Sequence, residues 1–351
     1  MRLFLQTALL CSFGVACCAQ ETTLHTTTTL VVVPTLVQTS TQDIAYSLTA
    51  SDFVLTDNGI PQKINLEPTS TQPLSLVLLM QTGGSAIRQF PNYRNLKTMI
   101  DSLLESGAAS EHAPNQISIA NFDSQLEGVS PFTSNLAEWT DAINHPEPGD
   151  RGAAILDGLA YALSLLKDQP ATNRRAILLI SQPTDDGSKT SLKEILRTTA
   201  ETNTTIYSIT FSPEKTAFKD AFKNGSGHAN PPLVIGPINP GNANPANPGF
   251  SAYFDLGAPL KLALGAMRKN FAAEIASLTG GETATFDNQH ELDESLSTVA
   301  MHIRNRYVLT FQPASATSGL HALQVRIPSH PELTIIARTS YWSSQPQTTP
   351  Q

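Results

Sequence analysis

The sequence predicts an α/β fold with a doubly wound, mainly parallel sheet, to which the two ends of the chain add a β-sandwich-like module. From Leu74 onwards, short apolar runs alternate with segments of helical length, which is typical of a parallel sheet covered on both faces. Before Leu74 and after Arg306, β-branched runs are separated by turn signals, as in antiparallel strands. Of the 351 residues, 40% are hydrophobic, which is enough for an ordinary packed core.

The first residues have the pattern of a secretory signal. A basic start at Arg2 is followed by an apolar stretch and by small residues ending at Ala19, which predicts export from the cytoplasm. Cys11, Cys17 and Cys18 all lie in this leader, so the remaining chain has no cysteine with which to form a disulfide. An alternative cleavage would leave Cys17 as a lipid anchor. No later segment is apolar over the length needed to span a bilayer, and we expect no transmembrane segment after the leader.

Changes in composition divide the chain into segments. Between Pro213 and Gly257 the chain is rich in Pro, Asn and Gly, which favours a solvated insertion over helix or central strand. The predicted division is a signal peptide over 1–19, an N-terminal β segment over 20–72, an α/β domain over 73–306 with the insertion at 213–257, a C-terminal β segment over 307–343, and a disordered tail over 344–351.

Four apolar runs suit central strands of the α/β domain, and helical periodicity fills the segments between them. The expected strands are 73–80, 117–122, 175–181 and 205–211, with a short fifth strand at 282–286. The expected helices cover 93–104, 154–166, a segment starting at Ser188, 260–278 and 292–304. In the N-terminal β segment, Asp57 to Pro61 is a turn signal between two strands.

The charge pattern excludes one class of partner. The formal net charge is -8, and no run of Lys or Arg offers a surface for a phosphate backbone. We therefore expect no nucleic-acid partner.

Several short motifs, in order, resemble the von Willebrand factor type A fold, and more narrowly the VWFA-related domain proteins of the Acidobacteria type. They are 48–64 with its Asp-Phe and Asp-Asn-Gly elements, Asn121–Ser124, Gly152–Leu159, Ala276–Gly281, Arg306–Leu309 and Ala337–Trp342. The resemblance implies a bacterial adhesion-type domain whose binding site lies at the C-terminal edge of the sheet.

In metal-binding members of that fold, an Asp-x-Ser-x-Ser loop, a threonine and a second aspartate hold a divalent cation. The resemblance places Gln81, Gly83 and Ser85 at the loop positions, Ala153 at the threonine and Gln182 at the second aspartate. Only Ser85 keeps the family residue. Because Mg²⁺ and Ca²⁺ need negatively charged oxygen ligands, the sequence predicts a degenerate site without metal and without any other cofactor.

Asp185 and Asp186 keep an alternative open, in which they and Ser85 bind a cation from a displaced position. Their Pro-Thr-Asp-Asp-Gly context favours turn chemistry or a cap for the helical segment starting at Ser188. Asp157 could border the site as well, but a solvated or capping role is favoured for it.

A hydrolase is a further alternative, but the sequence contains no motif that supports it. Thr82, Ser85 and Ser181 follow strands, but no Gly-x-Ser-x-Gly elbow occurs, and His112, His145 and His228 are scattered in turn-like segments. We therefore expect a protein that is not an enzyme. The predicted function is extracytoplasmic, non-catalytic binding of a protein or other macromolecule, in adhesion or envelope assembly. The candidate contact residues are Gln81, Thr82, Gly83, Ser85, Ala153, Gln182, Asp185 and Asp186.

Overall fold

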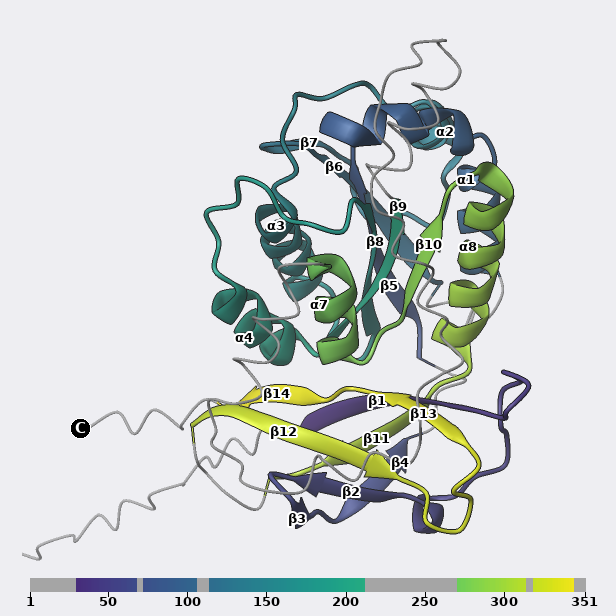
Figure 1. Ribbon diagram of the computed structural model, residues 1–351, viewed down its shortest axis with the longest axis vertical. Coiled ribbons are helices and arrows are strands. Elements are labelled where there is room, and N and C mark those ends of the chain that lie inside the picture. The colour runs from purple at the N-terminus through teal and green to yellow at the C-terminus, as the bar shows by residue number, and fades with distance from the viewer. Residues whose placement is uncertain (1–29, 68–71, 106–113, 212–269, 314–317, 344–351) are drawn as a thin grey trace, which may run out of the picture.

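The computed structural model describes residues 30–67, 72–105, 114–211, 270–313 and 318–343, which form an α/β part and a β-sandwich (Figure 1). The leader with its three cysteines, the predicted insertion and the predicted tail lie outside the described residues. Within the described ranges, no helix combines the length and apolar character needed to cross a membrane.

The α/β part contains a six-stranded sheet in the order β10-β9-β8-β5-β6-β7. Neighbouring strands are parallel except for β6 and β7, which pair antiparallel at one edge. The strands are β5 Leu74–Gln81, β6 Gln116–Phe122, β7 Leu126–Val129, β8 Arg174–Ser181, β9 Thr204–Phe211 and β10 Thr283–Phe286. The predicted doubly wound α/β fold is confirmed, and the antiparallel strand β7 is an addition that the sequence did not indicate.

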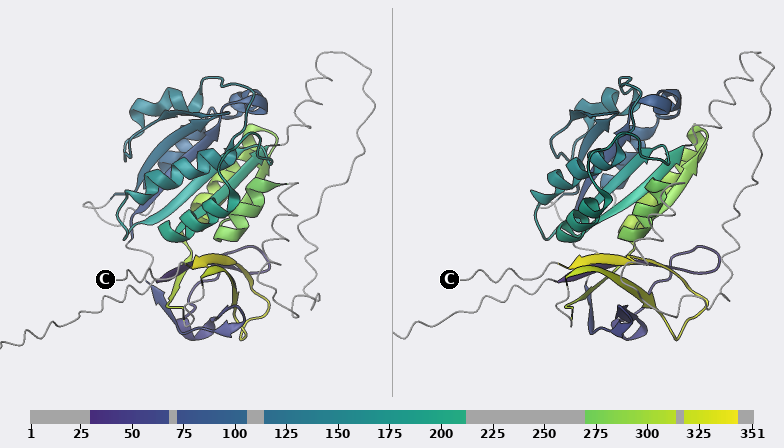
Figure 2. Two further views of the ribbon diagram at one scale, coloured as in Figure 1. Left: turned by 90° about the vertical axis from the view of Figure 1, so that its left-hand side faces the viewer. Right: turned by 60° about the vertical axis from the view of Figure 1, so that its left-hand side comes forward.

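Strand β5 shows why the sheet needs a helical layer on each face. Its side chains alternate, so that Leu76 and Leu78 pack into one apolar cluster while Val77 and Leu79 pack into another. The first cluster lies under α1 Leu96–Glu105, α2 Thr140–Asn144 and α8 Gln289–Arg304; the second lies under α3 Ile155–Lys167, α4 Leu192–Thr202 and α7 Phe271–Thr279. Figures 1 and 2 show these helices on opposite faces. Short 3₁₀ turns complete the part: η2 Gly84–Asn92 and η3 Ala137–Trp139.

The two ends of the chain form the β-sandwich together. One sheet has the order β13-β1-β11-β4, and the other has the order β14-β12-β2-β3. Their strands are β1 Val31–Gln38, β2 Val54–Asp57, β3 Ile60–Pro61, β4 Ile64–Glu67, β11 Tyr307–Phe311, β12 Gly319–Arg326, β13 Thr334–Ala337 and β14 Ser340–Ser343, with a 3₁₀ turn η1 at Ala50–Asp52. Phe53, Leu55, Leu309 and Phe311 meet in a core between the sheets.

Two local expectations need correction. The turn at Asn58 and Gly59, both at positive φ, joins β2 to the short strand β3, whereas β4 crosses to the other sheet and pairs with β11. The helix expected from Ser188 begins only at Leu192, because the hydroxyl of Ser191 accepts a hydrogen bond from the Glu194 amide and caps it.

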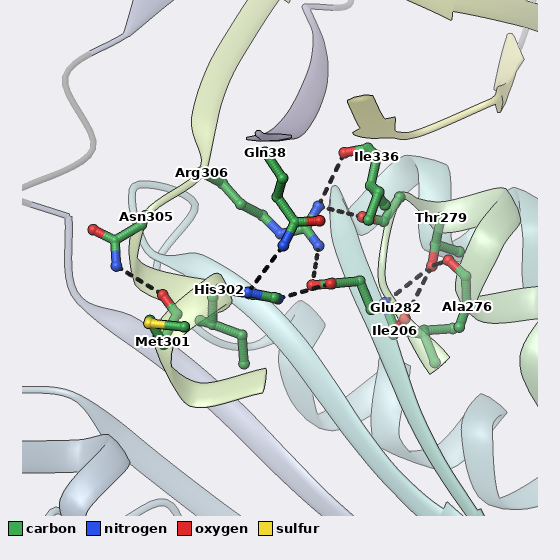
Figure 3. Close-up of polar contacts among 12 residues, drawn as sticks. Gln38, Ile206, Ala276, Thr279, Glu282, Met301, His302, Asn305, Arg306 and Ile336 are labelled. Atoms are coloured by element: carbon green, nitrogen blue, oxygen red, sulfur yellow. Dashed lines mark hydrogen bonds and ion pairs between the residues drawn. The ribbon is translucent and has the colours of Figure 1, made fainter. Parts of the chain in front are cut away.

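A buried polar cluster joins the sandwich to the amino end of the α/β sheet (Figure 3). Arg306, between α8 and β11, donates from Nη2 to Glu282 Oε2 at 2.8 Å and from Nη1 to the Gly280 carbonyl at 2.5 Å. His302 Nδ1 lies 2.8 Å from the other oxygen of Glu282. Burial alone would raise the pKa of Glu282, but the hydrogen bond from His302 and the charge of Arg306 outweigh it and lower that pKa below its usual value.

Close backbone contacts complete this interdomain joint, by which we mean Gly280–Glu282, His302, Arg306 and Arg338. A Cβ on Gly281 would lie 1.8 Å from the Ile206 carbonyl oxygen, and a Cβ on Gly280 would lie 2.5 Å from the Arg338 amide nitrogen. Buried Arg338 donates to the carbonyls of Thr204 in the α/β part and of Val32 in the sandwich. The joint therefore depends on two glycines and on guanidinium groups that bridge both parts.

Candidate functional site

The candidate site lies where the strand order reverses. From β5 the chain crosses to β6 on one side, while β8 and β9 lie on the other, so the reversal falls between β5 and β8. Ligands of open α/β sheets bind at the carboxyl ends of the strands at such a position. Gln81 is the last residue of β5, and Gln182 follows directly after β8.

A neutral hydrogen-bond network connects these two strand ends. The fully buried amide of Gln81 accepts from the Gln182 backbone amide through Oε1 at 2.8 Å. Its Nε2 donates to the Gly83 carbonyl at 3.0 Å and to Gln182 Oε1 at 3.3 Å. The Ser85 hydroxyl donates to the same Oε1 at 2.9 Å. The structure thus brings together Gln81, Ser85 and Gln182, and we call these three side chains the amide network.

Gly83 occupies a place with no room for a side chain. A Cβ there would lie 2.6 Å from both the Asp123 Cβ and the Gly152 carbonyl oxygen. The next residue, Gly84, donates its amide to the Asp150 carbonyl at 2.7 Å, which holds two loops backbone to backbone. A serine at position 83, with its hydroxyl as a metal ligand, would require these loops to separate.

Several candidate contact residues are buried. Gln81, Thr82, Gly83 and Ala153 are all covered, and the Thr82 hydroxyl donates to the Phe122 carbonyl at 3.1 Å. These residues can shape the edge of the sheet without touching a partner directly. Ser85, Gln182 and Asp185 are partly exposed, and Asp186 is exposed.

Asp185 acts at the start of α3. Its Oδ1 accepts from the Leu156 amide at 3.0 Å and from the Ser188 hydroxyl at 2.5 Å, and that hydroxyl also accepts from the Leu156 amide at 3.0 Å. A carboxylate is favoured there because the first amides of a helix lack partners within the helix. The sequence predicted that Asp185 caps the helical segment starting at Ser188. That prediction is wrong, because Asp185 caps α3.

Asp186 and Ala153 join the loop after β8 to the loop before α3 through the backbone. The Asp186 amide donates to the Ala153 carbonyl at 2.9 Å, and the Ala153 amide donates back to Asp186 at 3.3 Å. Asp157 holds the following turn, since its carboxylate accepts from the amides of Lys189 and Thr190. Burial opposes the ionisation of Asp157, yet hydrogen bonds from Thr190 and Lys189 outweigh it and lower its pKa.

Two acidic residues of the site escaped the analysis of the sequence. Buried Asp123 accepts from the Asp150 amide at 2.8 Å and from the Gln125 amide at 2.8 Å. Asp150 in turn accepts from the amides of Ser124 and Gly152, and the hydrogen bond from the Ser124 hydroxyl lowers its pKa. Asp123 belongs to the Asn121–Ser124 motif and directly follows β6, which was the available signal.

The side chains at this edge form hydrogen bonds, and they do not have the arrangement of a metal site or of an activated nucleophile. Among the described residues, no three or more His, Cys, Asp or Glu side chains converge as metal ligands would. Ser181 donates its hydroxyl to the Gln182 carbonyl at 2.8 Å, and the Ser85 hydroxyl bonds an amide oxygen where a nucleophile would need a base. His145 is exposed after α2, and His112 and His228 lie outside the described residues.

Comparison with known proteins agrees with this topology. Residues 76–206 match the model of the von Willebrand factor type A domain. The region from within β5 to the first residues of β9 therefore has a von Willebrand A-like fold, and the candidate site lies within it. No curated protein matches the chain in sequence.

Solved structures of similar fold are distant in sequence. Proximal thread matrix protein 1 from the mussel byssus has 11% identity and a TM-score of 0.43, covering 70% of this chain and 49% of its own. BatB from Bacteroides thetaiotaomicron has 14% identity and a TM-score of 0.38, covering 65% and 99%. The pilus adhesin SpaC from Lactobacillus rhamnosus GG has 10% identity and a TM-score of 0.42, covering 77% and 34%. The chain thus spans about half the length of the mussel protein, and these likenesses concern the fold alone.

Proposed function

We propose that this protein is an extracytoplasmic, non-catalytic binding module that recognises a protein or other macromolecule at the carboxyl edge of its six-stranded sheet without a metal ion. The amide network carries the proposal. Gln81, Ser85 and Gln182 satisfy one another where the resemblance puts a cation and its ligands.

The physical argument against a cation rests on charge and space. Mg²⁺ gives up its hydration water only for well-placed oxygens with carboxylates among them. The amide network offers neutral oxygens that are already hydrogen-bonded, and position 83 has no space for a hydroxyl ligand. Asp185, the acidic candidate nearest to Gln182 along the chain, accepts a hydrogen bond at the start of α3.

Exposed groups on the segments that follow β5 and β8 supply the contact surface. Ile87 is 39% exposed in η2, next to exposed Arg88, and Asp186 and Lys189 are exposed on the loop after β8. An exposed apolar side chain beside a charged one suits recognition of another surface. The secretory pattern of the leader supports a partner outside the cytoplasm, whether the chain is released or held through Cys17.

A pull-down from envelope extracts tests the proposed surface. The double variant Ile87→Asp/Arg88→Glu should lose the partner that the wild-type chain retains. Ile60→Asp is the matched control, because Ile60 is 56% exposed on β3 in the sandwich. Equal capture by both variants would place the contact elsewhere.

Calorimetric titration with Mg²⁺, Mn²⁺ and Ca²⁺ tests the absence of a metal. We expect no heat of binding up to millimolar cation. Micromolar binding that Asp185→Ala abolishes would instead establish the metal-dependent alternative.

A further inference from the structure

A cleft of about 380 Å³ separates the amino end of the six-stranded sheet from the β-sandwich. Its lining includes Leu74 at the start of β5, so it lies at the opposite end of that strand from Gln81 and the proposed contact edge. The volume falls in the range of small-molecule sites. The joint residue Arg306 and the loop before β8 also border it.

One wall of the cleft is apolar. In β1 the side chains of Val31 and Val33 enter the sandwich core, which turns Val32 and Pro34 to the other face of the strand, where they line the cleft. Pro34 pairs with Val308 of β11, which continues this wall.

Two consecutive arginines at the start of β8 border the cleft, and the alternation of the strand places Arg174 on the face covered by α8 and Arg175 on the face covered by α3 and α4. Arg174 donates from Nε to the Gln72 carbonyl and from Nη1 to the Ile303 carbonyl, at 3.2 and 2.9 Å. Arg175 donates from Nη1 to Thr202 and from Nη2 to Gln169, again to carbonyls. A guanidinium has five N–H donors, so each side chain keeps donors beyond these bonds.

Neither charge has a carboxylate partner among the described residues. The two acidic side chains that line the cleft are engaged elsewhere: Glu67 accepts from the Thr310 hydroxyl at 3.0 Å, and Glu201 lies 3.4 Å from Arg197. Burial lowers the pKa of the Arg174 guanidinium, and the nearby charge of Arg304 adds to the effect against an opposing contribution from Tyr207. Partly buried cations with neutral partners favour an anion beside them.

We propose that this cleft binds a small amphipathic carboxylate, with its carboxylate on Arg174 and its apolar body against Val32, Pro34 and Val308. The fork of a single guanidinium group matches the planar, two-oxygen geometry of a carboxylate. The apolar wall selects acids that carry a hydrocarbon part over acetate.

Titration calorimetry of the full chain with octanoate, octanol and acetate tests the assignment. Octanoate should bind at least about tenfold more tightly than octanol, which lacks the charge, or acetate, which lacks the chain. Arg174→Gln should weaken octanoate binding by about tenfold or more. Arg326→Gln removes the same charge from an exposed position of β12 and should leave binding unchanged.

A variant on the apolar wall is an independent test, in case the arginine variant fails to fold. Val32→Glu leaves both guanidinium groups in place, brings a carboxylate into the cleft and should abolish octanoate binding while circular dichroism stays that of the wild type. Absence of octanoate binding to the wild type, equal binding of octanol, or binding that survives Arg174→Gln would overturn the proposal.

Discussion

The two ends of the six-stranded sheet are closed by different chemistry. At the carboxyl end, neutral amides and hydroxyls link the strand ends, and the carboxylates of Asp123, Asp150 and Asp185 accept backbone amides. At the amino end, the interdomain joint buries Arg306 against Glu282 and holds Arg338 on carbonyls of both parts.

We infer that the amino end of the sheet fixes the structure, whereas the carboxyl end provides a surface that can vary. Charged groups buried in the joint are costly to unpair, so a substitution there should lower the stability of the whole chain. Groups at the carboxyl edge bond to neighbouring loops of the same α/β part, through neutral amides and hydroxyls or from carboxylates to backbone amides, so substitution should be milder and should change the contact surface. The four predictions below test this contrast.

Gly281→Ala should cause the largest loss. The added Cβ meets the Ile206 carbonyl oxygen at 1.8 Å, and backbone on both sides must move, which should lower the free energy of unfolding by about 3 kcal/mol or more. Urea denaturation measures it. Gly59→Ala is the control for backbone strain alone, since nothing lies within 4 Å of its Cβ and its φ is +81°; it should cost about 1 kcal/mol. Equal losses would mean that the joint is not tightly packed.

Glu282→Gln should destabilise the chain by about 2–3 kcal/mol at pH 7, because it leaves buried Arg306 without its carboxylate. The folded pKa of Glu282 lies below its usual value of 4.5, so its ionised form contributes stability above that value, and the contribution is lost as the pH falls through the folded pKa. The difference between wild type and variant should therefore be full at pH 7 and shrink as the pH falls below 4.5.

The control for this pH dependence is Glu294→Gln, whose side chain is 66% exposed beside His290. Its effect should stay within about 0.5 kcal/mol at every pH. A Glu282 effect that is independent of pH would contradict an ion pair at the joint.

Gln81→Leu should cost about 1–2 kcal/mol, because it leaves the Gln182 amide and the Gly83 carbonyl without their side-chain partner in a buried place. Thermal unfolding with and without Mg²⁺ should show the same loss. Gln324→Leu, exposed on β12, is the matched control. A loss as large as that of Gly281→Ala would remove the proposed contrast between the two ends of the sheet.

Regions held by contacts between residues close in the sequence could be predicted, whereas regions held by contacts between distant residues could not. The strand from Leu74 to Gln81 was predictable because its own apolar run specifies a buried strand. The positions of Gln81 and Gln182 followed from the resemblance, and parallel strands bring their ends to one edge. The joint could not be predicted, since Arg338 bonds to Thr204 across 134 residues and no local pattern records that pairing. The prediction for Asp185 was wrong for the same reason, because the Leu156 amide that it caps lies 29 residues earlier.

Asp185→Ala should have the smallest effect, about 1 kcal/mol, since it removes one carboxylate from the start of α3 while the Ser188 hydroxyl still accepts from the Leu156 amide. Asp186→Ala is the control, because the structure uses Asp186 through its backbone and its side chain is exposed. Chemical denaturation in EDTA and in Mg²⁺ should give the same difference between the two variants. A helix cap stabilises the chain regardless of cations, whereas a ligand would do so only when the metal is present, so a loss confined to Mg²⁺ would turn Asp185 from a capping residue into a metal ligand.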